Sequence, residues 1–173
     1  SLAVLLDEGG LADRGSILAT DVSRPSLARA KRGVYSSWSL RGVDPHRVDR
    51  YFRKDGPSYL LEERVRRRVS FDYLNLALDA YPSLVTGTWG LDLVLCRNVL
   101  IYFGRQAVER VAARLHGTLV DGGWLITGPS DPPLGGAAPF DVVTTPWGVF
   151  YRRRGPRTAF LVEAPHAAEP LDT

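Results

Sequence analysis

The sequence predicts an α/β protein: helices packed on a mostly parallel sheet, with a small antiparallel β subdomain inserted at about residues 34–72. Segments with helical and strand-like patterns alternate along most of the chain, as in such sandwiches. Between residues 34 and 72 short strand-like runs interrupt that rhythm. The length of 173 residues and the 45% hydrophobic content suit one packed domain. We place this domain at residues 1–154 and interpret the Pro- and Ala-rich residues 155–173 as a linker or disordered tail.

The first elements are marked by their end signals. Residues 2–6 fit a helix that the glycines at 9–10 would end. Residues 16–21, "SILATD", have the β-branched and apolar composition of a buried strand. Residues 23–33 follow as a helix, because Ser23 is a suitable N-cap, a proline stands in the first turn and a glycine ends the run.

The inserted stretch contains one more helix and two strands. Residues 43–52 predict a helix with Asp44 at its cap. "KDGPSYLL", residues 54–61, reads as a turn and a short strand, and "RVRRRVSF", residues 64–71, alternates well enough for another strand.

The helix–strand rhythm then resumes. "LDLVLC", residues 91–96, predicts a buried strand, and residues 105–120 predict a helix with apolar residues on one face. Two glycines at 122–123 would turn the chain into a strand over 124–128. Residues 140–154 predict a hairpin around Pro146-Trp147-Gly148.

Composition excludes several classes of protein. No run is long enough for a membrane span, and no signal peptide opens the chain. The single cysteine, Cys96, excludes an internal disulfide and favours a reducing cytoplasm. The net charge is +3, carried mostly by Arg, which does not favour nucleic-acid binding over contact with an acidic protein. The chain has no Met and opens on an uncapped apolar helix, so we expect part of the protein to lie upstream.

Polar residues follow two of the predicted strands in the first half of the chain. In open α/β sheets, ligands bind beyond the carboxyl ends of the strands. Asp21 stands at such an end and could accept both hydroxyls of a ribose, or it could cap the helix that starts at Ser23. Asn75, in "FDYLNL", could bond an adenine edge, or it could be a turn residue.

A third strand end carries Arg97 and Asn98, directly after "LDLVLC". They could line a pocket for a nucleoside-like cofactor, or Arg97 could form a structural ion pair. Cys96 has no obvious catalytic partner, and we interpret it as a buried strand residue. His46, His116 and His166 lack a metal-binding spacing, so we expect no metal site and place these residues on exposed positions.

The motifs together resemble one family. "LDLVLCRNVLIYF", an amphipathic helix and "DGGWLITGPSD" are similar to the CheR-type methyltransferases that methylate glutamates of chemotaxis receptors. "ILATDVS", "LARAKRGVYS", "RGVDPHRVDRYF" and "FDYLNL" resemble that family in the same order. The resemblance covers about residues 1–154. It implies a class I, Rossmann-like methyltransferase fold that uses S-adenosylmethionine, with a small antiparallel β subdomain inserted.

The resemblance also implies roles for individual residues. Asp21 would hold the ribose of S-adenosylmethionine, Asn75 and Leu76 would contact the adenine, and Arg97 and Asn98 would line the cofactor pocket. Tyr102 would stand near the transferred methyl group, aimed inward by a short helix. The family's first strand, its glycine-containing cofactor loop and its N-terminal helical domain would lie before Ser1, so we expect the chain alone to be inactive. "GPSD" stands where the family usually has Gly-His-Ser-Glu.

The implied partner is a methyl-accepting chemotaxis receptor, and we expect a cytoplasmic monomer. In some members of the family the β subdomain grips a peptide at the receptor's C-terminus. The corresponding turn looks shorter here, so we expect direct binding to acidic receptor helices, helped by Arg64 and Arg66–Arg68. These arginines could also be a solvated strand face. Two other functions stay open: an inactive homologue acting as a binding module in a signalling complex, and a nicotinamide dehydrogenase, for which no fingerprint loop is seen.

Overall fold

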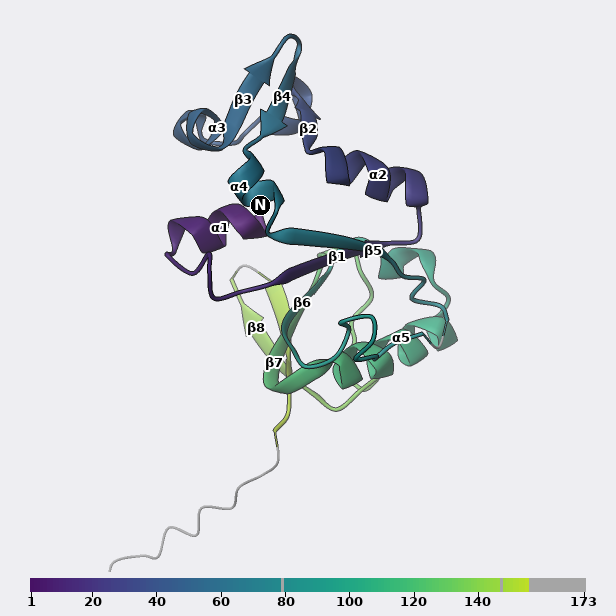
Figure 1. Ribbon diagram of the computed structural model, residues 1–173. Helices are drawn as coiled ribbons and strands as arrows, with labels where there is room; N and C mark the ends of the chain where they lie inside the picture. Colours follow the sequence, from purple (N-terminus) through teal and green to yellow (C-terminus); the bar gives the residue numbers. More distant parts are fainter. Residues whose placement is uncertain (79, 147, 156–173) are drawn as a thin grey trace, which may run out of the picture. The chain divides into compact units, whose positions relative to one another are not determined.

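The computed structural model describes residues 1–78, 80–146 and 148–155 (Figure 1). It divides into two units, Ser1–Gly87 and Thr88–Thr173, and each is described by itself. Trp147 of the predicted hairpin turn and nearly all of the predicted tail fall outside the described residues. Among those that are described, no helix combines the length and the hydrophobicity that crossing a membrane requires.

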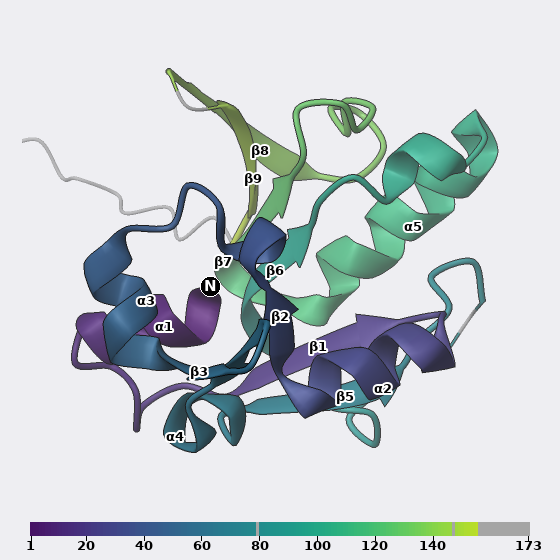
Figure 2. The same cartoon turned by 90° about the horizontal axis from the view of Figure 1, so that it is seen from above.

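The first unit is built on a parallel strand pair. Helix α1 (Leu2–Glu8) precedes strand β1 (Ile17–Asp21), and helix α2 (Arg24–Arg32) follows it. The predicted end signals of α2 are confirmed. Ser23 Oγ accepts the backbone N–H of Ser26 at 3.3 Å, and Gly33 ends the helix at a left-handed φ of 65°. In Figure 2, α2 runs beside β1 and its neighbour β5 (Val69–Tyr73).

The predicted antiparallel sheet is present in this unit. Its strands are β2 (Val34–Ser36), β4 (Ser58–Leu61) and β3 (Phe52–Asp55), in the order β2-β4-β3. A short 3₁₀ helix, η1 (Ser37–Leu40), and helix α3 (Pro45–Tyr51) connect β2 to β3. Asp44 caps α3 as predicted, since its carboxylate accepts the His46 N–H at 2.8 Å.

The strand predicted over residues 64–71 is wrong. Helix α4 (Glu63–Arg66) occupies the first part, and β5 begins only at Val69. Strand β5 pairs in parallel with β1, with Asp21 opposite Tyr73, so it does not belong to the antiparallel sheet. Tyr51 and Val65, both almost fully buried, pack with Ala3 at the base of this sheet.

The second unit contains one mixed sheet with the order β6-β7-β9-β8. Its elements are β6 (Leu91–Cys96), the 3₁₀ helix η2 (Leu100–Tyr102), α5 (Arg105–Thr118), β7 (Leu119–Thr127), β8 (Phe140–Thr145) and β9 (Gly148–Arg153). Strands β6 and β7 are parallel, whereas β9 runs antiparallel to both β7 and β8. The sheet is therefore less parallel than predicted, while the α/β class and the β8–β9 hairpin are confirmed.

Helix α5 buries the face that its spacing predicts. Val108, Val111, Ala112 and Leu115 are buried, and Leu119 is buried as the first residue of β7. Strand β7 begins directly after α5, but its pairing with β6 slips between Leu119 and Trp124, and Gly122 has a left-handed φ of 79°. The chain therefore bends at Gly122 and Gly123 inside β7, and not between a helix and a strand as predicted. A Cβ on Gly123 would lie 2.9 Å from the carbonyl oxygen of Val120, so the backbone at this bend leaves no room for a side chain.

Candidate functional site

Three predicted site residues lie at the carboxyl end of the β1–β5 pair. Asp21 ends β1, and its carbonyl oxygen accepts the N–H of Leu74 at 3.2 Å. This bond places Asp21 beside the segment that carries Asn75 and Leu76. The first unit therefore brings the residues expected to contact the ribose and the adenine to one strand end, where open α/β sheets bind their ligands.

The Asp21 carboxylate is exposed and only partly used. Its Oδ1 accepts the backbone N–H of Ser23 at 2.7 Å, which steadies the turn into α2. Ser23 itself, not Asp21, is the N-cap of that helix. Within the described residues, Oδ2 has no hydrogen-bond partner. One carboxylate oxygen thus remains able to accept a hydroxyl of a ligand.

Asn75 and Leu76 form the turn after β5. Asn75 Oδ1 accepts the Ala77 N–H at 2.9 Å, and its carbonyl oxygen accepts the Leu78 N–H at 3.1 Å. The carbonyl oxygen of Leu76 accepts the hydroxyl of Tyr81 at 3.1 Å. Asn75 is therefore a turn residue in this structure, the alternative that the sequence left open. Its amide nitrogen can still donate to a ligand from this half-buried position.

Strand β6 delivers Arg97 and Asn98 to its carboxyl end in the second unit. The Arg97 side chain is exposed and, in the part of the chain that the structure describes, forms no ion pair, so nothing there supports the structural alternative. Cys96, the last residue of β6, is 6% exposed. Burial, together with the charge of Asp131, raises the pKa of its thiol to about 11, so the sulfur stays protonated at neutral pH. This agrees with its interpretation as a buried strand residue.

Asn98 adopts a backbone conformation that most residues avoid. Its φ is 59°, in the left-handed region where Asn is among the few tolerated side chains. Gly128, at the end of the neighbouring strand β7, lies directly against it. A Cβ on Gly128 would be 2.9 Å from Asn98 Oδ1 and 3.0 Å from the Asn98 nitrogen. The absence of a side chain at 128 therefore makes room for the turn at 98.

A residue that the sequence prediction missed holds this region together. The carboxylate of Asp131 accepts the backbone N–H groups of Gly128, Asn98, Val99, Leu100 and Ile101, at 2.8, 2.6, 3.0, 2.9 and 3.3 Å. The signal that the sequence offers is the acidic residue of "GPSD", which stands just after a predicted strand. The sequence does not reveal that its partners stand about thirty positions upstream.

The same contacts control the charge of Asp131. Partial burial raises the pKa of this carboxyl, but hydrogen bonds from Gly128, Asn98, Leu100 and Ile101 lower it more, and the net shift is downward. Asp131 is consequently an anion at neutral pH. An anion facing several amides at the start of η2 also stabilises that short helix.

Tyr102 differs from its prediction in one respect. The short helix that carries it is confirmed as η2, anchored by the fully buried Leu100. The Tyr102 side chain, however, is 82% exposed. The expectation that it points inward is not met within the described residues: it is presented to solvent on a firmly held segment.

The arginines at 64 and 66–68 are engaged within the first unit. Arg64 pairs with Asp7 at 2.8 Å, Arg66 and Arg67 both pair with Glu63, and Arg68 pairs with Asp13 at 3.2 Å. The prediction of a strand face is wrong, because Arg64 and Arg66 belong to α4. Four guanidinium groups face three carboxylates, so little free positive charge remains to attract a partner.

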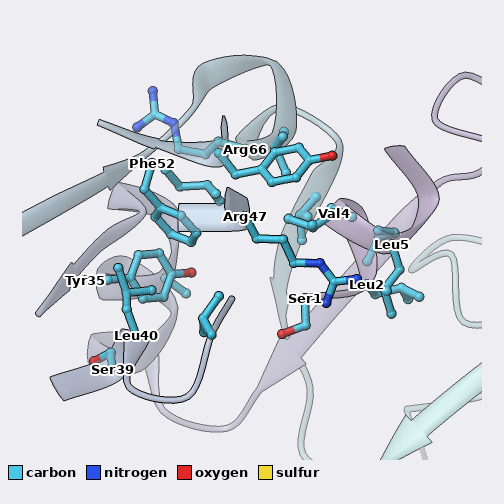
Figure 3. Close-up of a pocket in the computed structure, with 18 of the residues that line it drawn as sticks. Ser1, Leu2, Val4, Leu5, Tyr35, Ser39, Leu40, Arg47, Phe52 and Arg66 are labelled. Carbon is cyan, nitrogen blue, oxygen red and sulfur yellow. The ribbon is translucent and has the colours of Figure 1, made fainter. Parts of the chain in front are cut away.

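The first unit also contains a cavity of about 530 Å³ with mainly apolar walls (Figure 3). Its lining includes Ile17 and Val69, the first residues of β1 and β5, and Tyr35, Phe52 and Arg47. Asp21 and Asn75 are not among its lining residues. The cavity thus reaches the amino ends of the two strands, opposite to the ends where a ligand of this sheet is expected.

The comparisons with known proteins agree on one family. A model described as the CheR methyltransferase, SAM binding domain, matches residues 1–149. The chain is 38% identical over 162 residues to chemotaxis protein methyltransferase 1 of Pseudomonas aeruginosa, covering 89% of this chain and 57% of that protein. It is 36% identical to chemotaxis protein methyltransferase Cher2 of Pseudomonas putida, with the same coverage.

A third relative carries a different name. The probable biofilm formation methyltransferase WspC of Pseudomonas aeruginosa is 34% identical over 171 residues, covering 98% of this chain and 38% of that protein. The chain spans a little over half the length of the first two relatives.

Proposed function

Because this chain belongs to the CheR methyltransferase family and carries its S-adenosylmethionine-binding domain, we propose that the whole protein methylates glutamate side chains of chemotaxis receptors. The products would be glutamate methyl esters. The observation that carries the proposal is the "CRNVLIYF" segment, which consists here of a strand end at the buried Cys96, a left-handed Asn98 and an anchored η2. A cytoplasmic location follows from the same proposal, since the modified receptor helices would lie there.

The residues of the first unit suit the nucleoside part of S-adenosylmethionine. Asp21 offers a free carboxylate oxygen at a strand end, the group that a ribose hydroxyl requires. Asn75 offers an amide nitrogen, and Leu76 offers an apolar contact for the adenine. In the second unit the exposed Arg97 and the Asn98 side chain follow the carboxyl end of β6, and we propose them as that unit's cofactor-binding residues.

Methyl transfer to a carboxylate requires orientation more than acid–base chemistry. When bound, S-adenosylmethionine supplies an electrophilic methyl group on a sulfonium. The glutamate side chain is already an anion at neutral pH, so no general base is needed. The protein's main task is then to hold the attacking oxygen in line with the methyl group. Tyr102, exposed on η2, could donate its hydroxyl to that carboxylate and orient it.

The name of the third relative supports a second candidate. WspC is called a probable biofilm formation methyltransferase, and its similarity extends over 98% of this chain. The same chemistry would then act on the receptor of a chemosensory system that controls biofilm formation. The catalytic residues would be unchanged, and only the receptor would differ.

Transfer of tritiated methyl groups tests the proposal. The full-length protein would be incubated with labelled S-adenosylmethionine and membranes containing a chemoreceptor. Label that is released as methanol in alkali identifies a carboxyl ester, and a receptor with its acceptor glutamates changed to alanine should take up none. A receptor from a biofilm-controlling system distinguishes the second candidate. Alkali-stable label, or none with either receptor, would contradict both.

A further inference from the structure

One carboxylate in the second unit binds two chain segments at once. Asp131 Oδ1 accepts the N–H groups of Val99, Leu100 and Ile101, while Oδ2 accepts those of Asn98 and Gly128. Both oxygens are therefore fully occupied by backbone, and neither is left for a ligand. The role of Asp131 therefore lies in the two backbone segments that it binds.

The two segments are neighbours because their strands are. Cys96, the last residue of β6, is paired with Thr127, the last residue of β7. The chain leaves both strands at the same end of the sheet, and Asp131 lies three residues beyond Gly128. Its carboxylate closes the loop after β7 and ties it to the loop after β6. Four consecutive N–H groups, from Asn98 to Ile101, converge on the anion.

Such convergence fixes the backbone of the loop. Consecutive amides face one anion at the start of a helix, or in a turn where a left-handed residue stands beside right-handed ones. Asn98 is the left-handed residue here, at φ 59°, a conformation that costs free energy unless the surroundings stabilise it. The hydrogen bonds at 2.6–3.3 Å from Asn98 through Ile101 offset that cost. Both the Asn98 side chain and the start of η2, which carries Tyr102, depend on this arrangement.

On the basis of the proposed function, we infer that Asp131 is a positioning residue for methyl transfer. It contacts neither the cofactor nor the receptor. It holds Asn98 at the cofactor pocket and Tyr102 at the acceptor carboxylate by fixing the backbone that carries them. Loss of the carboxylate should therefore loosen this loop and slow the reaction while the rest of the second unit stays folded.

Amide hydrogen exchange tests the structural half without any substrate. In Asp131→Asn one oxygen becomes an NH₂ group, so the side chain cannot serve both sets of donors. Exchange at residues 98–101 and 128, followed by NMR, should become about tenfold faster or more, while exchange in α5 stays unchanged. Asp141→Asn is the matched control, because Asp141 lies in the same unit and its carboxylate, among the described residues, binds only the exposed Arg154. Unchanged exchange in the loop, or a uniform increase throughout the unit, would overturn the inference.

Kinetics of the full-length protein test the functional half. With Asp131→Asn, kcat should fall roughly 10- to 100-fold, the scale of a misplaced catalytic group, and the Kd for S-adenosylhomocysteine should rise. Asp131→Glu keeps the charge and both oxygens and should recover part of kcat. An undiminished kcat in a variant whose loop amides have lost protection would refute a positioning role. If the wild-type protein labels no receptor, the proposed function fails, whereas the exchange result still stands or falls separately.

Discussion

Replacing Asp21 separates its two candidate roles, because the structure assigns them to different oxygens. Oδ1 holds the Ser23 N–H at 2.7 Å, and Oδ2 is free within the described residues. Asp21→Asn keeps an acceptor for Ser23 and removes the negative charge. Asp21→Ala removes both. If Asp21 binds a ribose hydroxyl, the two variants should lose similar cofactor affinity and differ in folding stability.

The magnitude follows from the bonds involved. A charge-assisted hydrogen bond to a ligand contributes about 1–3 kcal/mol, so the Kd for S-adenosylhomocysteine should rise roughly 5- to 150-fold in both variants. The contact of Oδ1 with Ser23 is exposed, so its loss in Asp21→Ala should cost about 0.5–1.5 kcal/mol of folding stability. Asp21→Asn should unfold at nearly the same temperature as the wild type.

Calorimetry with S-adenosylhomocysteine on the full-length protein, and thermal melts of each variant, give these values. Asp44→Asn is the matched control: Asp44 is also exposed and accepts a backbone N–H two residues ahead, from His46 at 2.8 Å, at the start of another helix of the same unit. That variant should bind the cofactor normally. Normal binding by Asp21→Asn, or equal losses in the two asparagine variants, would refute the ribose assignment and leave Asp21 as a turn residue.

The sequence predicted those parts of the fold that local signals determine. Ser23 and Gly33 mark the ends of α2 through their own side-chain and backbone preferences, and the structure confirms both. Asp44 does the same for α3. The end of the strand at Cys96 was also predictable, because an apolar run stops there at two polar residues. The predicted burial of the strand is not seen within the described residues, where Leu93 and Leu95 are 39% and 49% exposed.

The parts that failed depend on pairings that the alternation of apolar and polar residues does not reveal, some local and some with partners far away in the sequence. "RVRRRVSF" alternates like one strand, but Glu63 pairs with Arg66 and Arg67 at helical spacing, and β5 begins where pairing with β1 becomes available. The alternation of apolar and polar residues predicts neither these ion pairs nor the point at which β5 begins. His116 was expected to be exposed, yet it is half-buried with its ring edge-on to Phe140, 5.0 Å away between centroids.

Asp131 shows the same limit at the candidate site. Strand-end logic proposes Asp21, the last residue of β1, and Arg97 and Asn98, which directly follow β6. Asp131 acts through amides some thirty positions earlier, and only the pairing of β6 with β7 brings these together. Candidate ligand-binding residues are therefore easier to propose from the sequence than a residue such as Asp131, which fixes the backbone at Asn98.

Three further predictions concern Tyr102, Gly128 and His116. Tyr102→Phe should lower kcat with little change in the Kd for S-adenosylhomocysteine; an equal loss of affinity would move this exposed residue to the cofactor pocket. Gly128→Ala should destabilise the protein by about 1–3 kcal/mol in urea unfolding, because the new Cβ would lie 2.9 Å from Asn98 Oδ1. In the control Gly136→Ala the new Cβ meets no atom within 4 Å, so the only loss of stability comes from placing alanine at a positive φ. His116 should make stability pH-dependent. Burial and the nearby Arg153 lower the pKa of His116 below its ordinary 6.5, so the unfolded chain takes up a proton first as the pH falls. Its contribution is therefore fully present above pH 6.5 and declines as the pH falls from there toward the folded-state pKa. Asp131, Asp7 and Glu63, whose pKa values are lowered, stay ionised in both states between about pH 7.5 and pH 5.5 and add little there. Urea unfolding from pH 7.5 to pH 5.5 should show a smaller loss of unfolding free energy in His116→Gln than in the wild type. An identical dependence of the unfolding free energy on pH in both proteins would show that this imidazole is not shielded from water.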